Sequence, residues 1–283
     1  MEVSYYPGCS HHGTALEYTE STKAVSRLLD VDLRELPDWG CCGATSAHVL
    51  DEHLATSLAV RNLAIARQEA KDLVVPCAAC YNRFKTAQHS LRKVSPSDRD
   101  SAQPVLSLLD LFDSPDLRES ILTHIRVRLD NLKVVCYYGC LLVRPPDATG
   151  ERDFEFPENM DRIIRLLGAE TLAWSHKTDC CGASMTLTKK DITRKLVNNL
   201  LSKAAAAGAE AVVVACPFCH LNLDSRQNEF RQNTDSYNEL PIFYFTELMG
   251  ISFGMKDSRR WLRRHFINPL PLLMSKGLIQ GEA

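Results

Sequence analysis

The sequence lacks the features that mark export, membrane insertion or nucleic-acid binding. Its first seven residues contain neither a basic segment nor an apolar core, so we expect no secretory signal. The longest apolar stretch, residues 204–218, is interrupted by Gly208, Glu210 and Pro217 and is too short to cross a bilayer. The formal net charge of -2 gives no electrostatic reason to expect nucleic acid as a partner. These absences predict a cytoplasmic protein without direct membrane insertion.

Two cofactor motifs are also missing. No Cys-x2-Cys-x2-Cys-x3-Cys-Pro run occurs, so the chain carries no ferredoxin module of its own. No Gly-x-Gly-x-x-Gly fingerprint for a flavin or a nicotinamide occurs either. If the chain handles electrons, they must arrive from another protein.

Cysteine, in contrast, is abundant, with eleven residues in a chain of 283. A disulfide framework would require an export signal and usually a small, core-poor domain. This chain is long enough to bury a sizeable core, and 45% of its residues are hydrophobic. The cysteines therefore indicate metal or redox chemistry in a reducing compartment.

Ten of the eleven cysteines form two copies of one pattern, which indicates an internal duplication. Each copy has one cysteine, then a Cys-Cys-Gly-Ala motif, then a Cys-x-x-Cys pair after an apolar run. In both copies 34 residues lie between the vicinal pair and the Cys-x-x-Cys pair. The copies are Cys9, Cys41, Cys42, Cys77 and Cys80, and Cys140, Cys180, Cys181, Cys216 and Cys219.

Hydrophobic patterning predicts the same alternation of strands and helices around both copies. We expect strands over 2–6, 33–36 and 73–76 and over 133–138, 171–174 and 211–215. We expect helices over 15–29, 47–69, 157–167 and 189–207, with a further helix opening at each Cys-x-x-Cys pair. This order predicts an α/β fold of two tandem domains, each a mostly parallel sheet flanked by helices. Every cysteine motif then falls at the carboxyl edge of a sheet, where ligands of such folds bind.

The predicted domains are residues 1–120 and 131–252, with a boundary near 114–131. Residues 90–103 are polar and read as a surface excursion, and residues 144–150 as a loop. The tail, residues 253–283, has a basic segment followed by an apolar run. It reads as an amphipathic helix that covers the second domain, or as a docking element for a partner.

The vicinal cysteines narrow the chemistry of each site. A Cys-x-x-Cys pair alone could be a redox pair, half of a zinc site or part of an iron–sulfur site. Neighbouring side chains diverge, so adjacent cysteines reach two irons of one cluster more easily than one metal. Five thiolates also exceed the four ligands of zinc or of an ordinary cubane cluster. The fifth is then either a spare thiol or a ligand of an unusual cluster.

These motifs resemble the paired CCG domains of the heterodisulfide reductase B subunit, over residues 1 to about 250. The resemblance implies two noncubane [4Fe–4S] clusters, each bound by five cysteines. The first would be held by Cys9, Cys41, Cys42, Cys77 and Cys80. The second would be held by Cys140, Cys180, Cys181, Cys216 and Cys219.

The resemblance also implies the reaction and the partners. The disulfide of coenzyme M and coenzyme B, or a bacterial counterpart, would lie between the clusters and receive one electron from each. The ferredoxin-like C subunit and the flavin-containing A subunit of such complexes would supply the electrons. We therefore expect a disulfide-reducing oxidoreductase subunit that works within a multi-subunit complex. The alternatives are a noncatalytic electron-transfer subunit of a quinone-linked or sulfur-oxidising complex, and a zinc or thiol–disulfide protein.

Residues outside the two cysteine sets carry weaker signals. Cys136 has no counterpart in the first copy and reads as a buried strand cysteine rather than a ligand. Polar residues beside the motifs read as surface or supporting groups rather than substrate ligands, although His220 could donate a hydrogen bond to a cluster. They are His11, His12, Arg83, Arg144, Lys189 and His220.

Overall fold

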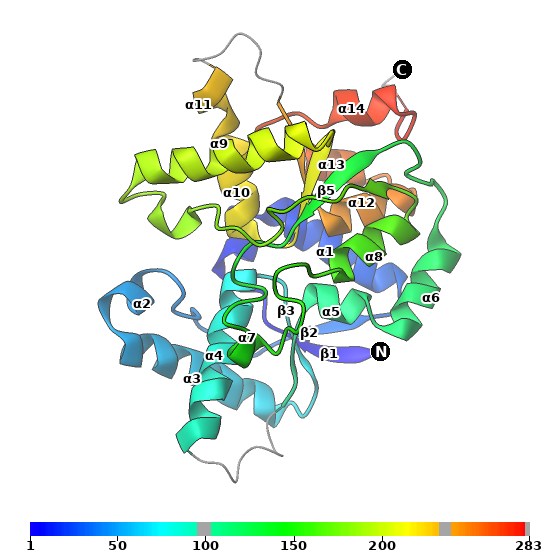
Figure 1. Cartoon of the computed structure of the whole chain (residues 1–283). Helices are drawn as coiled ribbons and strands as arrows, with labels where there is room; N and C mark the ends of the chain where they lie inside the picture. Colours follow the sequence, from blue (N-terminus) through cyan, green and yellow to red (C-terminus); the bar gives the residue numbers. More distant parts are fainter. Residues whose placement is uncertain (95–102, 232–238, 281–283) are drawn as a thin grey trace.

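Two parallel four-stranded sheets organise the chain, one in each half (Figure 1). The structure is a computed structural model that describes residues 1–94, 103–231 and 239–280. The first sheet has the order β2-β1-β3-β4 and the second the matching order β6-β5-β7-β8. Their strands are β1 Glu2–Tyr5, β2 Asp32–Glu35, β3 Leu73–Val75 and β4 Val105–Ser107, then β5 Lys133–Tyr137, β6 Glu170–Thr171, β7 Ala211–Val214 and β8 Ile242–Tyr244. The predicted α/β class and the duplication are confirmed.

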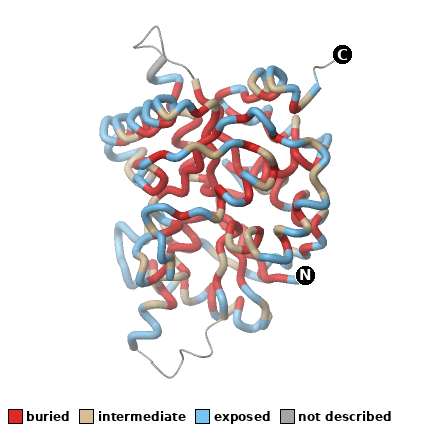
Figure 2. The backbone as a smooth tube through the Cα atoms, turned by 45° about the vertical axis from the view of Figure 1, so that its right-hand side comes forward, coloured by how far each residue is buried: buried red, intermediate tan, exposed pale blue. Residues whose placement is uncertain are grey.

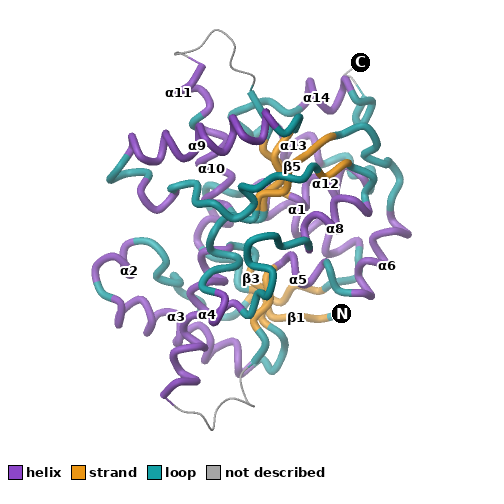
Figure 3. Tube along the Cα trace, in the orientation of Figure 1, coloured by secondary structure: helices purple, strands orange, loops and turns teal. Residues whose placement is uncertain are grey.

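Helices connect the strands and flank both sheets (Figure 3). In the first half they are α1 Leu16–Leu28, α2 Ser46–Leu50, α3 Glu52–Gln68, α4 Ala78–Val94 and α5 Leu108–Phe112. In the second half they are α7 Pro146–Thr149, α8 Asn159–Leu166, α9 Lys190–Ala206, α10 Pro217–Ser225, α11 Gln227–Arg231 and α12 Phe245–Ser252. The halves are joined by α6, Pro115–His124, and the chain ends with α13 Ser258–Leu262 and α14 Leu270–Ser275.

Several local predictions were wrong in detail. The single helix expected over 47–69 is broken at Asp51, whose carboxylate caps α3 by accepting hydrogen bonds from the amides of His53 and Leu54. The strand expected over 171–174 is only Glu170–Thr171. The expected loop at 144–150 contains the short helix α7. Residues 95–102 of the expected surface excursion lie outside the described residues.

Buried residues gather in the interior and exposed residues lie along the outer helices and loops (Figure 2). All residues of β3 and β7 are buried, as the apolar runs predict for parallel strands covered on both faces. The halves also share packed side chains, because α1 packs against α12 and α13. The rings of Tyr18 and Tyr244 stack with centroids 4.0 Å apart, and the hydroxyls of Ser21 and Thr246 are 2.7 Å apart. The first half therefore contributes α1 to an interior that both halves build.

The C-terminal tail does not form the single helix that the sequence suggests. It folds as two short helices, and α13 contacts α1 of the first half as well as α12 of the second. Arg260 and Arg264 both pair with Glu20 of α1. The tail therefore lies across both halves rather than over the second alone.

A buried ion pair supports the loop that leads to Cys140. Lys177 Nζ lies 2.9 Å from Asp161, and both side chains are almost fully buried. The Tyr138 hydroxyl donates to the same carboxylate at 2.7 Å. The backbone carbonyl of Lys177 accepts hydrogen bonds from the amides of Tyr138 and Gly139. This network attaches the segment around residue 177 to the end of β5.

Replacing Lys177 by Met should lower the free energy of unfolding by about 3 kcal/mol, because Asp161 is left as an unpaired buried charge. Chemical denaturation measures the loss. Arg34→Met is the control, since Arg34 pairs with Glu2 and Asp32 in solvent and its loss should cost less than about 1 kcal/mol. Adding Asp161→Asn to Lys177→Met should restore much of the stability. Equal effects of the two single variants would contradict a structural role for the buried pair.

Candidate functional site

A glycine begins the cysteine loop at the end of β1 and another at the end of β5. Gly8 and Gly139 have φ angles of 75° and 68°, which favour glycine. A Cβ atom on Gly8 would lie 3.1 Å from Cys80 Sγ, and one on Gly139 would lie 3.0 Å from Cys219 Sγ. A side chain at either position would therefore be strained by its backbone angle and would crowd the sulfur of the opposing Cys-x-x-Cys pair.

The glycines of the two Cys-Cys-Gly turns also have left-handed backbones and close neighbours. Gly43 and Gly182 have φ angles of 78° and 77°, and a Cβ on either would lie within 3.2 Å of a backbone atom of the following helix. Their amides donate hydrogen bonds to the first sulfur of each vicinal pair, at 3.4 Å to Cys41 and 3.3 Å to Cys180. The glycine thus allows both the tight turn and an amide directed at a sulfur.

The Cys-x-x-Cys pairs sit at the ends of β3 and β7, where α4 and α10 begin. Cys216 is the N-cap of α10. Hydrogen bonds from Cys219 and Cys77, with the amides of Cys219 and Phe218, lower the pKa of Cys216 well below its usual value despite burial. The predicted preference for thiolate at a helix N-terminus therefore holds at Cys216 but not at its counterpart Cys77, whose pKa is raised well above the usual value by its hydrogen bond to Cys216.

The five cysteines of each copy come together. One cavity is lined by all five of the first copy, and Cys42 Sγ lies 3.1 Å from Cys80 Sγ. In the second copy Cys181 Sγ lies 3.7 Å from Cys219 Sγ, and the Cys140 thiol donates to Cys180. All eleven cysteines are free thiols. Each group is therefore assembled from three segments that lie far apart in the sequence.

Hydrogen bonds within each group favour thiolate at some cysteines and thiol at others. Bonds from Cys41, and then from Cys80, lower the pKa of Cys42 to about 3. A bond from Cys140 lowers the pKa of Cys180 to about 6, and the Gly182 amide acts in the same direction. The pKa of the donor Cys41 is correspondingly raised. Because metals bind the deprotonated thiol, each group already contains a preferred first ligand.

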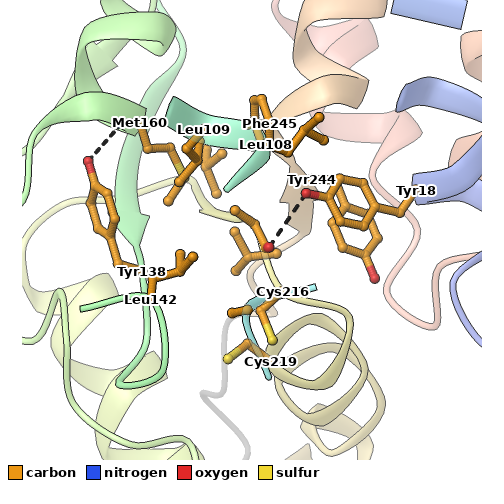
Figure 4. Packing of buried hydrophobic residues seen from close by; sticks show 14 of the residues in the cluster. Tyr18, Leu108, Leu109, Tyr138, Leu142, Met160, Cys216, Cys219, Tyr244 and Phe245 are labelled. Atoms are coloured by element: carbon orange, nitrogen blue, oxygen red, sulfur yellow. Dashed lines mark hydrogen bonds between the residues drawn. The ribbon is translucent and has the colours of Figure 1, made fainter. Parts of the chain in front are cut away.

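The two groups meet at the middle of the molecule. The thiols of Cys77 and Cys216 are close enough for each to shift the pKa of the other. The Tyr18 hydroxyl points at the carbonyls just before them, 3.4 Å from Pro76 O and 3.5 Å from Ala215 O. Figure 4 shows Tyr18 stacked on Tyr244 beside Cys216. The two sites are therefore adjacent and share a packed boundary.

Each group fits an iron–sulfur cluster by the chemistry of its donors. Five thiols surround one cavity in the first group, which is more than zinc or a cubane cluster uses. Glycines at the approach points leave room beside the sulfurs. The donor set is therefore suited to a polynuclear, sulfur-rich group.

The other residues named from the sequence lie away from these thiols or are already bonded. Cys136 is fully buried in β5, as expected, and burial raises its pKa well above the usual value. His11 is also buried, which lowers its pKa to about 3, and it contacts Thr19. His220 directs Nε2 at the carbonyl of Ile242, so this nitrogen does not donate to a sulfur. The exposed His12 stacks on Trp39.

The remaining three candidates are not brought together by any interaction among the described residues. Arg144 and Lys189 are exposed, and Arg83 is half-buried. None lines the cavity of the first group. Within the described part of the chain, these three residues therefore do not form an anion-binding site beside the cysteines.

One lining residue was missed by sequence reasoning. Phe218, from the second copy, lines the cavity of the first group together with Ser10 and Thr45. It lies between Cys216 and Cys219, so the second Cys-x-x-Cys pair supplies a wall of the first site. The sequence shows an aromatic residue inside the second Cys-x-x-Cys motif. That this residue lines the first site is evident only from the contact between the two copies in the structure.

Comparison with known proteins agrees with the duplication. The family model described as "Cysteine-rich domain" (CCG) matches residues 3–85 and 134–224. A protein of Wolinella succinogenes called 8-methylmenaquinol:fumarate reductase membrane anchor subunit is 28% identical over 96% of this chain and 99% of its own length. The B subunit of the ferredoxin:CoB-CoM heterodisulfide reductase of Methanosarcina mazei is 24% identical over 96% of both chains.

A solved structure shares the fold. A hypothetical protein from Helicobacter pylori superposes with a TM-score of 0.69 at 10% identity, covering 93% of this chain. This chain spans about half, 51%, of that protein. Among the described residues no helix is long and apolar enough to cross a membrane.

The fold, the cysteine sites and these relatives define an iron–sulfur electron-transfer subunit of the kind found in multi-subunit oxidoreductases. The chain belongs to the CCG cysteine-rich domain family, with both of its domain copies present.

Replacing Gly139 by Ala should remove iron from the second site, because the new Cβ meets Cys219 Sγ. The control is Gly150→Ala, at a φ of 79° with no atom within 4 Å of the new Cβ. Both variants carry the same left-handed strain, about 1–2 kcal/mol, so only the close approach differs. Iron per chain measures the outcome. Equal iron loss in both variants would mean that strain, and not the approach to sulfur, matters.

Proposed function

We propose that this chain is the disulfide-reducing subunit of a heterodisulfide reductase-type complex. Cys9, Cys41, Cys42, Cys77 and Cys80 would hold one noncubane [4Fe–4S] cluster, and Cys140, Cys180, Cys181, Cys216 and Cys219 a second. The observation that carries the proposal is the adjacency of the two thiol groups, because the Tyr18 hydroxyl lies within 3.5 Å of both Pro76 O and Ala215 O, the carbonyls just before Cys77 and Cys216. Two complete, adjacent sites suit a reaction that needs two electrons at one place.

The proposed reaction consumes two electrons and two protons and converts one disulfide into two thiols. When bound, the clusters would supply one electron each. The chain itself would hold the two sites in contact, through the Tyr18 hydroxyl between the carbonyls of Pro76 and Ala215. Phe218 would give the space at the first site an apolar wall. The M. mazei relative, named for the CoB-CoM heterodisulfide, suggests that disulfide or a bacterial counterpart as substrate.

Partner proteins would supply the electrons. Exposed apolar side chains follow the Cys-Cys-Gly turn in both halves, including Val49 and Leu50 after the first and Leu187 after the second. Exposed apolar patches of this kind often serve as protein interfaces. We infer that a ferredoxin-like partner, the C subunit of such complexes, docks beside the sites. It would receive electrons from the flavin-containing A subunit.

A quinol-linked electron conduit is the second candidate. The observation in its favour is the 28% identity to the W. succinogenes protein, whose name refers to a menaquinol:fumarate reductase. In that case the same cysteine sites would pass electrons between a quinol and a partner protein. No disulfide would then be reduced at the contact of the two sites.

Anaerobically purified chain should contain about eight irons, with comparable acid-labile sulfide. Cys41→Ser and Cys180→Ser should each lose about half of the iron, because the two sites use separate ligands. Cys136→Ala is the control and should keep all of it, since Cys136 is buried apart from both groups. Iron in all three variants at the level of the parent, or zinc in place of iron, would refute the ligand assignment.

Reoxidation of the dithionite-reduced chain separates the two functions. Under the proposal, a mixed disulfide reoxidises the chain and releases two thiols per disulfide, while a menaquinone analogue does so far more slowly. The Cys41→Ser and Cys180→Ser variants should lose at least tenfold in this rate, since one site alone holds a single electron. Fast reoxidation by the quinone with no thiol release would favour the conduit instead.

A further inference from the structure

A buried group of potential metal ligands lies outside the cysteine sites. His220 and Asp224 lie one turn apart on α10, and His265 comes from the segment after α13. One ligand atom from each side chain lies within 4.8 Å of the others. His220 and Asp224 are 4% and 1% exposed, and the His265 side chain is fully buried. Two imidazoles and a carboxylate thus converge beneath the surface.

The hydrogen bonds around this group fix which ring nitrogens are free. His265 Nε2 lies 2.8 Å from Glu247 Oε1, and His220 Nε2 lies 3.0 Å from the carbonyl oxygen of Ile242. A carbonyl and a carboxylate accept, so Nε2 of each histidine carries the proton. In the neutral ring Nδ1 then keeps a lone pair. Metal-binding histidines show the same pattern, with the second nitrogen bonded to a carboxylate or a carbonyl.

His265 Nδ1 is the polar atom that this arrangement leaves unexplained. It is buried and has no hydrogen-bond partner among the described residues. Buried ring nitrogens normally have one, because leaving them unpaired costs free energy. The Asp224 carboxylate accepts from the amides of Phe266 and Ile267, at 2.7 and 3.1 Å, and keeps further lone pairs.

The surroundings are rich in acidic groups. Asp224, Glu247 and Glu17 are all buried here. A divalent cation would balance two of these carboxylates when they are ionised. Burying charge without such compensation is costly.

We propose that His220, Asp224 and His265 bind a divalent transition-metal ion of the zinc class, separate from the iron–sulfur sites. Two nitrogens and one oxygen are ligands that zinc commonly takes. His265 also borders a surface cavity of about 550 Å³, while its side chain is fully buried. Arg259 and Arg263 lie on the same wall and would oppose cation entry without adding a ligand.

The site would attach the C-terminal tail to the helix that carries Cys219. His220 stacks on Tyr244, 4.2 Å between centroids, and Tyr244 stacks on Tyr18, which reaches both cysteine loops. In the first copy the positions of His220 and Asp224 are occupied by Tyr81 and Lys85. The proposed site is therefore an addition to the repeat, specific to the second copy.

Zinc content of the cluster-loaded chain tests this proposal, because loading occupies the cysteines. After equilibration with zinc chloride and desalting, elemental analysis should find about one zinc per chain beside the iron. Zinc-edge X-ray absorption should show nitrogen and oxygen neighbours without sulfur. Sulfur neighbours would place the zinc in a cysteine site and overturn the proposal, as would the absence of zinc.

Variants assign the ligands. Asp224→Asn and His265→Gln should bind zinc at least a hundredfold more weakly with iron unchanged. Glu247→Gln, which orients His265 without being a ligand and also caps α12, should bind zinc about 10–100-fold more weakly. His124→Gln, a histidine on α6, is the control and should bind zinc as the parent does. If His265→Gln does not fold, zinc binding by Asp224→Asn and the absorption spectrum of the parent still test the site. Undiminished zinc binding in Asp224→Asn would refute the site.

Discussion

The contact between the carboxyl ends of β3 and β7 is the constraint on which the rest of the molecule depends. Each strand is fully buried and leads into a cysteine, and the carbonyls just before Cys77 and Cys216 both lie within 3.5 Å of the Tyr18 hydroxyl. Two cysteine loops from opposite halves of the chain need a packed frame to stay side by side. The stacked rings of Tyr18 and Tyr244 and the packing of α1 on α12 provide that frame. The duplication gives two sites, and the interlocked packing makes them neighbours.

Glycine is the second requirement of this arrangement. Four positions, Gly8, Gly43, Gly139 and Gly182, combine a left-handed backbone with an approach that would be unusually tight for a Cβ. They occur as two equivalent pairs, one before the first cysteine and one after the vicinal pair. The matching of backbone angles between the copies, within 7° and 1°, indicates that the loop geometry is specified as tightly as the cysteines. Thiol identity alone would not bring five sulfurs around one cavity.

The sequence predicted the repeated unit well because its signals are local. Apolar runs located β3 and β7, and the spacing of the cysteines placed each motif at the end of a strand. The sequence-based prediction failed where one side chain sets the end of a helix. Asp51, for example, caps α3 and breaks the expected helix. The prediction also failed where the outcome depends on contacts distant in the chain. Neither the wall that Phe218 adds to the first site nor the path of the tail across α1 has a local signal.

The same distinction explains what separates the two copies. Both retain the residues that shape a cysteine site, but only the second has His220 and Asp224 on the helix after its Cys-x-x-Cys pair. The residue that joins them, His265, comes from the tail, outside the repeat, and Glu247 holds its ring from α12. A duplicated domain can acquire such a group in one copy only if new chain covers it. The tail covers the group here. The two copies therefore differ in the residues that surround the second cysteine site rather than in the cysteines themselves.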